Sequence, residues 1–173
     1  TVMARATPLE SWCRWLEVAE NSGKVRARNS DAGVGAAREL LWKQAKKRMK
    51  RAMREGFWLE AIALQESMIC DRLESWLSWS RSEVQFSTIG TLTGRLKRAR
   101  LADDSDELMS DLANWGHRRG RELHQMVKLG EGHDATWRAR LQDARRTAQD
   151  GERLVSRTDS AARKAARVRR KSA

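Results

Sequence analysis

The segment 57–79, FWLEAIALQESMICDRLESWLSW, is the most apolar part of the chain and would carry hydrophobic residues on more than one side of a helix. A helix of this kind has to be surrounded by other elements, so we expect it at the centre of the fold. Composition favours helical neighbours, because the 173 residues include one proline, no tyrosine and two phenylalanines. We therefore predict an all-α protein with one domain, in which eight tryptophans supply most of the aromatic core.

The other helices are predicted from apolar periodicity and from end signals. Thr7-Pro8-Leu9-Glu10 has the form of a capping box, and Gly56 is a suitable C-cap. We expect an N-terminal helix and loop (1–32) appended to a bundle (33–158), and a basic tail (159–173) that is either a frayed helix or a flexible arm. Helices are expected at about 8–22, 34–54, 57–79 and 89–101, across 112–128, and from 136 onward.

Two of these helices have a clear division between faces. The helix at 34–54 carries cations on one face, at Lys43, Lys46 or Lys47, Lys50 and Arg54, and an apolar stripe at Leu41, Ala45, Met49 and Ala52. The last helix has a seam that becomes rich in small residues: Trp137, Leu141, Ala144, Ala148, Gly151, Val155, Thr158, Ala162 and Ala165.

Positive charge is concentrated toward the C-terminus. The formal net charge is +12, and residues 138–173 hold 12 Lys and Arg against 4 Asp and Glu. A basic tail on a helical domain favours a polyanionic partner, most commonly nucleic acid, although a solvated arginine-rich helix is an equal alternative. The candidate nucleic-acid contacts are Arg118, Lys128, Arg163, Lys164, Arg167, Arg169 and Arg170.

Cysteine usage and hydropathy indicate no metal, cofactor or membrane. Cys13 and Cys70 form no CxxC pair and have no histidine at ligand spacing, so we expect neither a disulfide framework nor a zinc site. No apolar run approaches the roughly 20 residues of a membrane span, and no signal peptide is visible. We expect a cytoplasmic protein without a metal or cofactor.

The stretch 112–128, LANWGHRRGRELHQMVK, combines acid/base groups with cations. Leu112, Trp115, Leu123 and Met126 predict one buried flank, while His117, Arg121, His124 and Lys128 fall on a common face. Gly116 and Gly120, four residues apart, either allow another helix to approach closely or are tolerated weaknesses in the helix.

The central segment 57–79 also carries acidic residues. Either its carboxylates face water, or one of them, Glu66 or Asp71, reaches across to the arginines of 112–128. Histidine and arginine in a cationic setting suit phosphodiester chemistry on RNA without metal, because histidine moves protons and arginine stabilises developing negative charge. The plainer alternative is a surface histidine or a nucleic-acid contact.

Arg119-Gly120-Arg121-Glu122-Leu123-His124 resembles the R-x4-H signature of the HEPN superfamily, and the resemblance extends over roughly residues 34–158. It implies an antiparallel bundle of four to five helices that forms a homodimer, with Arg119 and His124 as the catalytic pair and Glu66 or Asp71 as a possible added carboxylate. Family members include metal-independent endoribonucleases that act as toxins or phage-defence effectors. Gly120 stands where asparagine is usual, and Met126 stands where silenced members have tyrosine.

We therefore expect a metal-independent endoribonuclease, with Arg121 and His117 supporting the Arg119 and His124 pair. Arg119 and His124 are five residues apart, about 140° around an ideal helix, so they meet only through a distortion near Gly120 or across two subunits. The expected partners are RNA, with DNA not distinguished, a second copy of the chain, and an antitoxin or regulatory protein. The alternative is a non-catalytic protein that binds nucleic acid or a protein partner.

Overall fold

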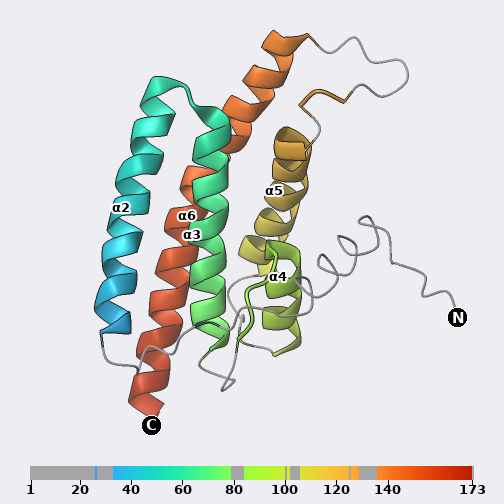
Figure 1. Cartoon of the computed structure of the whole chain (residues 1–173). Helices are drawn as coiled ribbons and strands as arrows, with labels where there is room; N and C mark the ends of the chain where they lie inside the picture. Colours follow the sequence, from blue (N-terminus) through green and yellow to red (C-terminus); the bar gives the residue numbers. More distant parts are fainter. Residues whose placement is uncertain are drawn as a thin grey trace, which may run out of the picture.

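The protein is an all-helical bundle, as its composition predicts (Figure 1). The computed structural model describes residue 26 and residues 33–78, 84–99, 101, 106–124, 126–128 and 136–172. The predicted helix at 8–22 lies outside these residues. The described helices are α2 (Val34–Glu55), α3 (Trp58–Leu77), α4 (Ile89–Arg98), α5 (Asp106–His124) and α6 (Trp137–Ser172).

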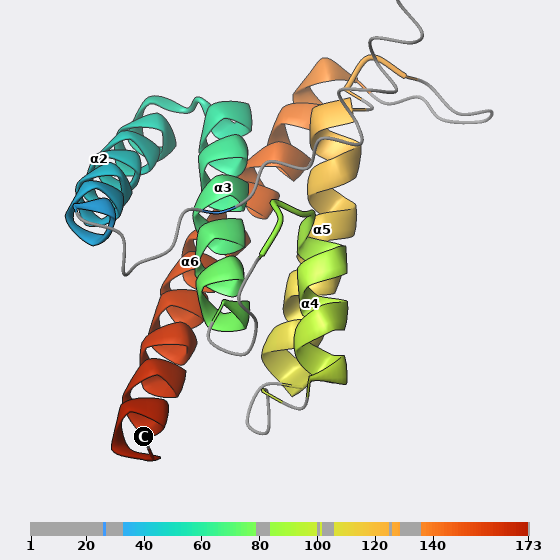
Figure 2. The same ribbon diagram turned by 60° about the horizontal axis from the view of Figure 1, so that its bottom comes forward.

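The central helix is α3, which contacts each of the other described helices. In Figure 1, α2 lies on one side of α3, α4 and α5 lie on the other, and α6 crosses behind it. Figure 2 shows α4 and α5 side by side. Buried residues lie on several sides of α3, which explains its continuous apolar sequence: Ala61, Ile62, Met68, Ile69, Leu73, Trp76 and Leu77.

The reversal between α2 and α3 occurs at Gly56. This residue has φ 80°, a left-handed conformation that glycine adopts without a Cβ penalty, and its N–H donates to the Ala52 carbonyl. The predicted C-cap is therefore confirmed. Because one glycine turns the chain, α2 and α3 form a tight helical hairpin.

The apolar stripe of α2 differs from the prediction at its first member. Leu41 is 65% exposed, whereas its neighbour Trp42 is buried. The guanidinium carbon of Arg72 lies 3.8 Å from the centroid of the Trp42 ring, and Arg72 Nε lies 2.6 Å from Asp159 Oδ1 on α6. Arg72, which belongs to α3, therefore links α2 and α6. Its guanidinium stacks on the Trp42 ring, which accounts for the inward position of this tryptophan.

The seam of α6 packs on α3 and α5 at its small residues. Ala144, Ala148, Gly151, Val155, Thr158 and Ala162 are buried, but Trp137 at the start is 59% exposed. At Gly151 the helices are so close that a Cβ would lie 2.1 Å from Gln65 Oε1 and 2.9 Å from the Trp115 ring. Gln65 Nε2 and Trp115 Nε1 donate to the Ala148 and Thr147 carbonyls at 2.7 and 2.8 Å.

The basic tail is not a separate arm, because α6 continues without interruption to Ser172. Its sequence is rich in Ala, Arg and Lys, which are good helix formers, and Arg163 Nε donates to Asp159 Oδ2 one turn earlier at 2.9 Å. The expected boundary at 158/159 therefore falls within a regular helix.

The glycines of α5 are not sites of close helix approach. A Cβ at Gly120 would meet nothing within 4 Å, and one at Gly116 would only touch Ile89, at 3.9 Å. The close crossing is at Gly151 instead. Of the described helices, none is both long and apolar enough to span a membrane.

Candidate functional site

The helix α5 carries the R-x4-H pair between a buried flank and an exposed one. Leu112 and Trp115 are fully buried against α4 and α6, and Leu123 and Met126 are partly buried. The opposite flank is exposed, as its spacing predicts, and carries His117, Arg121, His124 and, beyond the helix end, Lys128. Two imidazoles and two cations are thus accessible to solvent along one side of the helix.

Arg119 points toward α3 rather than into solvent. Its guanidinium forms an ion pair with Glu66, and the two side chains are only 19% and 23% exposed. Partial burial lowers the pKa of Arg119. Arg119 Nε is buried and has no hydrogen-bond partner among the described residues.

The structure separates the two carboxylates that the sequence left as alternatives. Glu66 reaches across to α5, whereas Asp71, more than one turn later on α3, faces Arg26 and Arg38. Asp71 Oδ1 lies 2.8 Å from Arg26 Nη1 and 3.3 Å from Arg38 Nε. Asp71 therefore belongs to a different ion cluster and does not contribute to the surroundings of Arg119.

The Arg26 cluster was not predicted from the sequence. Arg26 is 5% exposed, although it lies in a segment that reads as a polar loop. Its Nη1 also contacts Glu74 Oε2 at 3.3 Å, and its backbone N–H donates to the Val84 carbonyl at 2.9 Å. Burial raises the pKa of Glu74, although Arg26 opposes that shift. Arg26 stands among other polar and charged residues in the segment 23–33, which has no apolar periodicity that would signal burial.

Within the R-x4-H segment itself, Glu122 is the residue that the sequence analysis overlooked. It is 5% exposed, and burial, followed by repulsion from Asp143, raises the pKa of its carboxyl group. The signal was present in the sequence, since Glu122 follows the buried Trp115 by seven residues and therefore shares its flank. This buried acid lies two residues before His124 in the chain.

Arg119 and His124 do not share a flank. Arg119 is turned toward α3, whereas His124 is exposed at the last residue of α5. Arg121 and His117 lie on the exposed side with His124, while Arg118 is engaged elsewhere, with its Nη1 2.6 Å from Asp150 Oδ2 on α6. One protomer therefore presents an arginine–carboxylate pair and a separate histidine.

Several predicted nucleic-acid contacts come together along the end of α6. Arg163, Lys164 and Arg167 line an open cavity of about 300 Å³ together with Ser160, Val168 and Lys171. Arg169 is exposed, and the side chain of Arg170 lies outside the described part of the chain. The cavity is bordered by four cationic side chains, which is a suitable environment for a phosphate group.

In the part of the chain that the structure describes, no group of three or more His, Cys, Asp or Glu side chains is arranged to hold a metal ion. The candidate site consists of the Arg119–Glu66 ion pair and the separate, exposed His124, with Arg121 and His117 on the same side of α5 as His124. Comparison of the chain with protein-family models, with curated proteins and with solved structures found no match.

Proposed function

We propose that the protein is a metal-independent endoribonuclease of HEPN type, active as a homodimer. The observation that carries this proposal is the ion pair between Glu66 and Arg119. It brings a carboxylate of the central helix to the first residue of the R-x4-H segment, which is where the resemblance leads one to expect an added acid. The pair also holds the guanidinium in a fixed position, as electrostatic stabilisation of a transition state requires.

The proposed reaction is attack of a ribose 2′-oxygen on the adjacent phosphorus. The 2′-O–P bond forms and the P–O5′ bond breaks, which leaves a 2′,3′-cyclic phosphate and a free 5′-hydroxyl group. His124 moves a proton, either from the attacking 2′-hydroxyl or to the departing 5′-oxygen, and such assistance contributes about 10²–10⁴-fold. Arg119 stabilises the negative charge on the phosphoryl oxygens of the transition state, with Glu66 fixing its orientation.

A second subunit completes the site in this proposal. Arg119 faces α3 while His124 is exposed about 140° away around α5, so Arg119 of one protomer acts together with the partner's His124. A symmetric dimer would contain this arrangement twice. The biological setting that fits is a cytoplasmic toxin or phage-defence effector that is controlled by an antitoxin or another regulatory protein.

The first test is incubation of the purified protein with end-labelled RNA in EDTA, followed by analysis of the product ends. We expect cleavage with 2′,3′-cyclic phosphate ends, and a fall of about 10²–10⁴-fold in His124→Ala and Arg119→Ala. His117→Ala removes an exposed histidine with a supporting role from the same face of α5, so it should lower cleavage less than His124→Ala does. Equal cleavage by all variants would rule out the proposed site.

The second test addresses the shared site by mixing the two inactive variants. If Arg119 and His124 act across the interface, a heterodimer of Arg119→Ala and His124→Ala contains one intact site. Random exchange of subunits should then restore about a quarter of wild-type activity. If both residues act within one subunit, the mixture stays inactive.

The second candidate function is nucleic-acid binding without catalysis, and the cationic cavity on α6 favours it. Binding through phosphate contacts weakens steeply with salt because counterions are released. RNA that remains intact but is retained by the protein, with retention lost when residues 160–173 are deleted, would select this alternative. A truncated protein that binds as tightly as the full chain would count against it.

A further inference from the structure

The exposed side of α2 carries a row of cations without ion-pair partners. The two glutamates of this helix are engaged by arginines, Glu39 by Arg72 and Glu55 by Arg51. The row extends about 16 Å along the helix. Its members are exposed, recur at steps of four, three and four residues, and form no ion pair with any described residue: Lys43, Lys47, Lys50 and Arg54.

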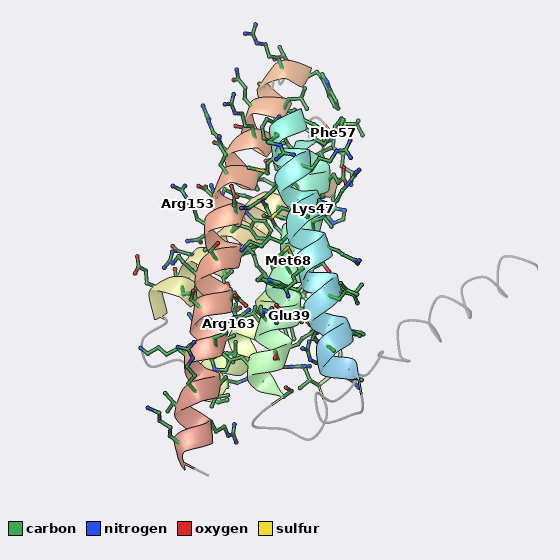
Figure 3. All side chains as sticks on the ribbon, turned by 90° about the vertical axis from the view of Figure 1, so that its left-hand side faces the viewer. Glu39, Lys47, Phe57, Met68, Arg153 and Arg163 are labelled. Atoms are coloured by element: carbon green, nitrogen blue, oxygen red, sulfur yellow. The ribbon has the colours of Figure 1, made fainter. Side chains whose placement is uncertain are left out.

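The cation row ends at an exposed aromatic ring. Phe57 follows the turn at Gly56, and its N–H donates to the Ala52 carbonyl at 2.9 Å, which fixes its backbone at the end of α2. The apolar residue at this position of a helix end often packs back on the helix, but Phe57 is 54% exposed. Figure 3 shows Lys47 and Phe57 on the same side of the molecule. A flat apolar surface is therefore accessible next to the cations.

The helix α6 contributes to the same surface near Phe57. Arg145 of α6 is exposed, and its guanidinium carbon lies 5.6 Å from the centroid of the Trp58 ring. Because Trp58 directly follows Phe57 in the chain, Arg145 adds a cation at the aromatic end of the row. Glu152, two turns further along the same flank of α6, is partly buried. The net charge of this surface therefore stays positive.

A single row of cations beside an exposed ring suits one strand of nucleic acid rather than a duplex. Lysine binds a phosphate as a point charge, so the row recognises a charged backbone without regard to sequence. A base stacks on an aromatic side chain when it is unpaired, and every base offers a face for such stacking. The two features thus match the two parts of an unpaired nucleotide.

We propose that the cation row of α2 and Phe57 bind a single-stranded polynucleotide, with phosphates along the row and one base stacked on the Phe57 ring. That this strand is RNA rests on the proposed function. The surface is separate from the candidate site, because Glu66 meets Arg119 on the α5 side of α3, whereas α2 lies on the other side (Figure 1). The row would retain a long RNA while another stretch of the same molecule reaches α5.

The test is binding of a labelled, unstructured RNA strand across a salt series, in the His124→Ala background so that the RNA stays intact. Phe57→Ala should weaken binding at least about fivefold and leave the slope of log K against log salt unchanged, because it removes stacking but no charge. Lys47→Gln/Lys50→Gln should weaken binding about tenfold. It should also lower that slope by about 1.4, since each neutralised phosphate of a single strand contributes about 0.7.

Each variant has a matched control. Phe86→Ala removes a phenylalanine that is 55% exposed in the segment before α4, and Lys97→Gln/Arg98→Gln removes two exposed cations from α4. Both controls should change binding less than twofold. Three results would overturn the proposal: equal loss in a variant and its control, a duplex that binds as tightly as the strand, or polyglutamate that displaces RNA at equal concentration of charge.

Cleavage is measured separately, in the protein with His124 intact. Strand binding that depends on Phe57, without any cleavage, would refute only the proposed function. Cleavage by a protein whose strand binding is indifferent to Phe57 and to the cation row would refute only the α2 surface.

Discussion

The carboxylates of α3 form two separate groups of ion pairs, and these groups differ in burial. In the Glu66–Arg119 pair both side chains are about a fifth exposed. In the cluster of Arg26, Asp71 and Glu74, the arginine and Glu74 side chains are each 3% exposed. Both members of the first pair are partly exposed, whereas two of the three members of the second cluster are almost fully buried.

The difference separates a functional ion pair from a structural one. Removing one member of a buried cluster leaves charges without partners in a medium that solvates them poorly, so the penalty falls on folding. Removing one member of a partly exposed pair leaves a charge that water can reach. We therefore expect the Arg26 cluster to determine stability and the Glu66 pair to determine activity.

The largest effect should come from Arg26→Ala. Glu74 would remain buried without its ion-pair partner, and the free energy of unfolding should fall by about 3–5 kcal/mol at pH 7. Urea denaturation of the full chain measures the change. The control is Arg51→Ala, which breaks an exposed pair with Glu55 and should cost under about 1 kcal/mol.

The pH dependence of this variant adds a further check. Burial raises the pKa of Glu74 above its ordinary value of 4.5, so its neutral form is the one that the fold favours. A carboxyl group whose pKa is higher in the folded protein than in the unfolded chain stabilises the fold below pH 4.5. This contribution is lost as pH rises through the pKa of the folded state. Without Arg26 the folded pKa rises further, so the deficit of Arg26→Ala should shrink as pH is lowered toward 4.5. A deficit independent of pH would contradict this account.

The fold was predictable because its signals repeat over many residues. The apolar segment 57–79 and the seam of α6 extend over several turns, so one wrong member, such as Leu41 in place of Trp42, does not change the assignment. The site was less predictable. Glu66 and Asp71 are five residues apart and point in different directions, and only the packing of α5 and of Arg26 decides which carboxylate meets which cation.

The second largest effect should come from Gly151→Ala, which acts at the same level of α3 as Glu66. The new methyl group would overlap Gln65 and Trp115, and the free energy of unfolding should fall by about 1–3 kcal/mol. Gly120→Ala is the control, because its Cβ meets nothing within 4 Å and it should gain up to about 1 kcal/mol. Similar stability of the two variants would show that α3, α5 and α6 adjust freely at this crossing.

A smaller change in stability, with a larger one in activity, is expected for Glu66→Gln. Loss of a partly exposed ion pair should cost about 1 kcal/mol, while Arg119 loses its fixed orientation and RNA cleavage falls about tenfold. Glu60→Gln makes the same change on α3 at a pair with Arg48 away from α5, and should leave cleavage unchanged. If both variants cleave like the wild type, Glu66 has no role in the site.

The smallest effect on stability is expected for Gly120→Asn, which tests the position between the two members of the R-x4-H pair. The Cβ has open space around it, and asparagine has a helix propensity better than glycine by about 0.3 kcal/mol, so the variant should be slightly more stable. Its amide would add a donor one turn before His124, and cleavage should rise several-fold. Gly116→Asn is the control one turn earlier: it should stabilise the helix in the same way but leave RNA cleavage unchanged. If the two variants gain stability alike and neither changes cleavage, position 120 influences the helix but not the reaction, and Arg119 and His124 act without an intervening polar group.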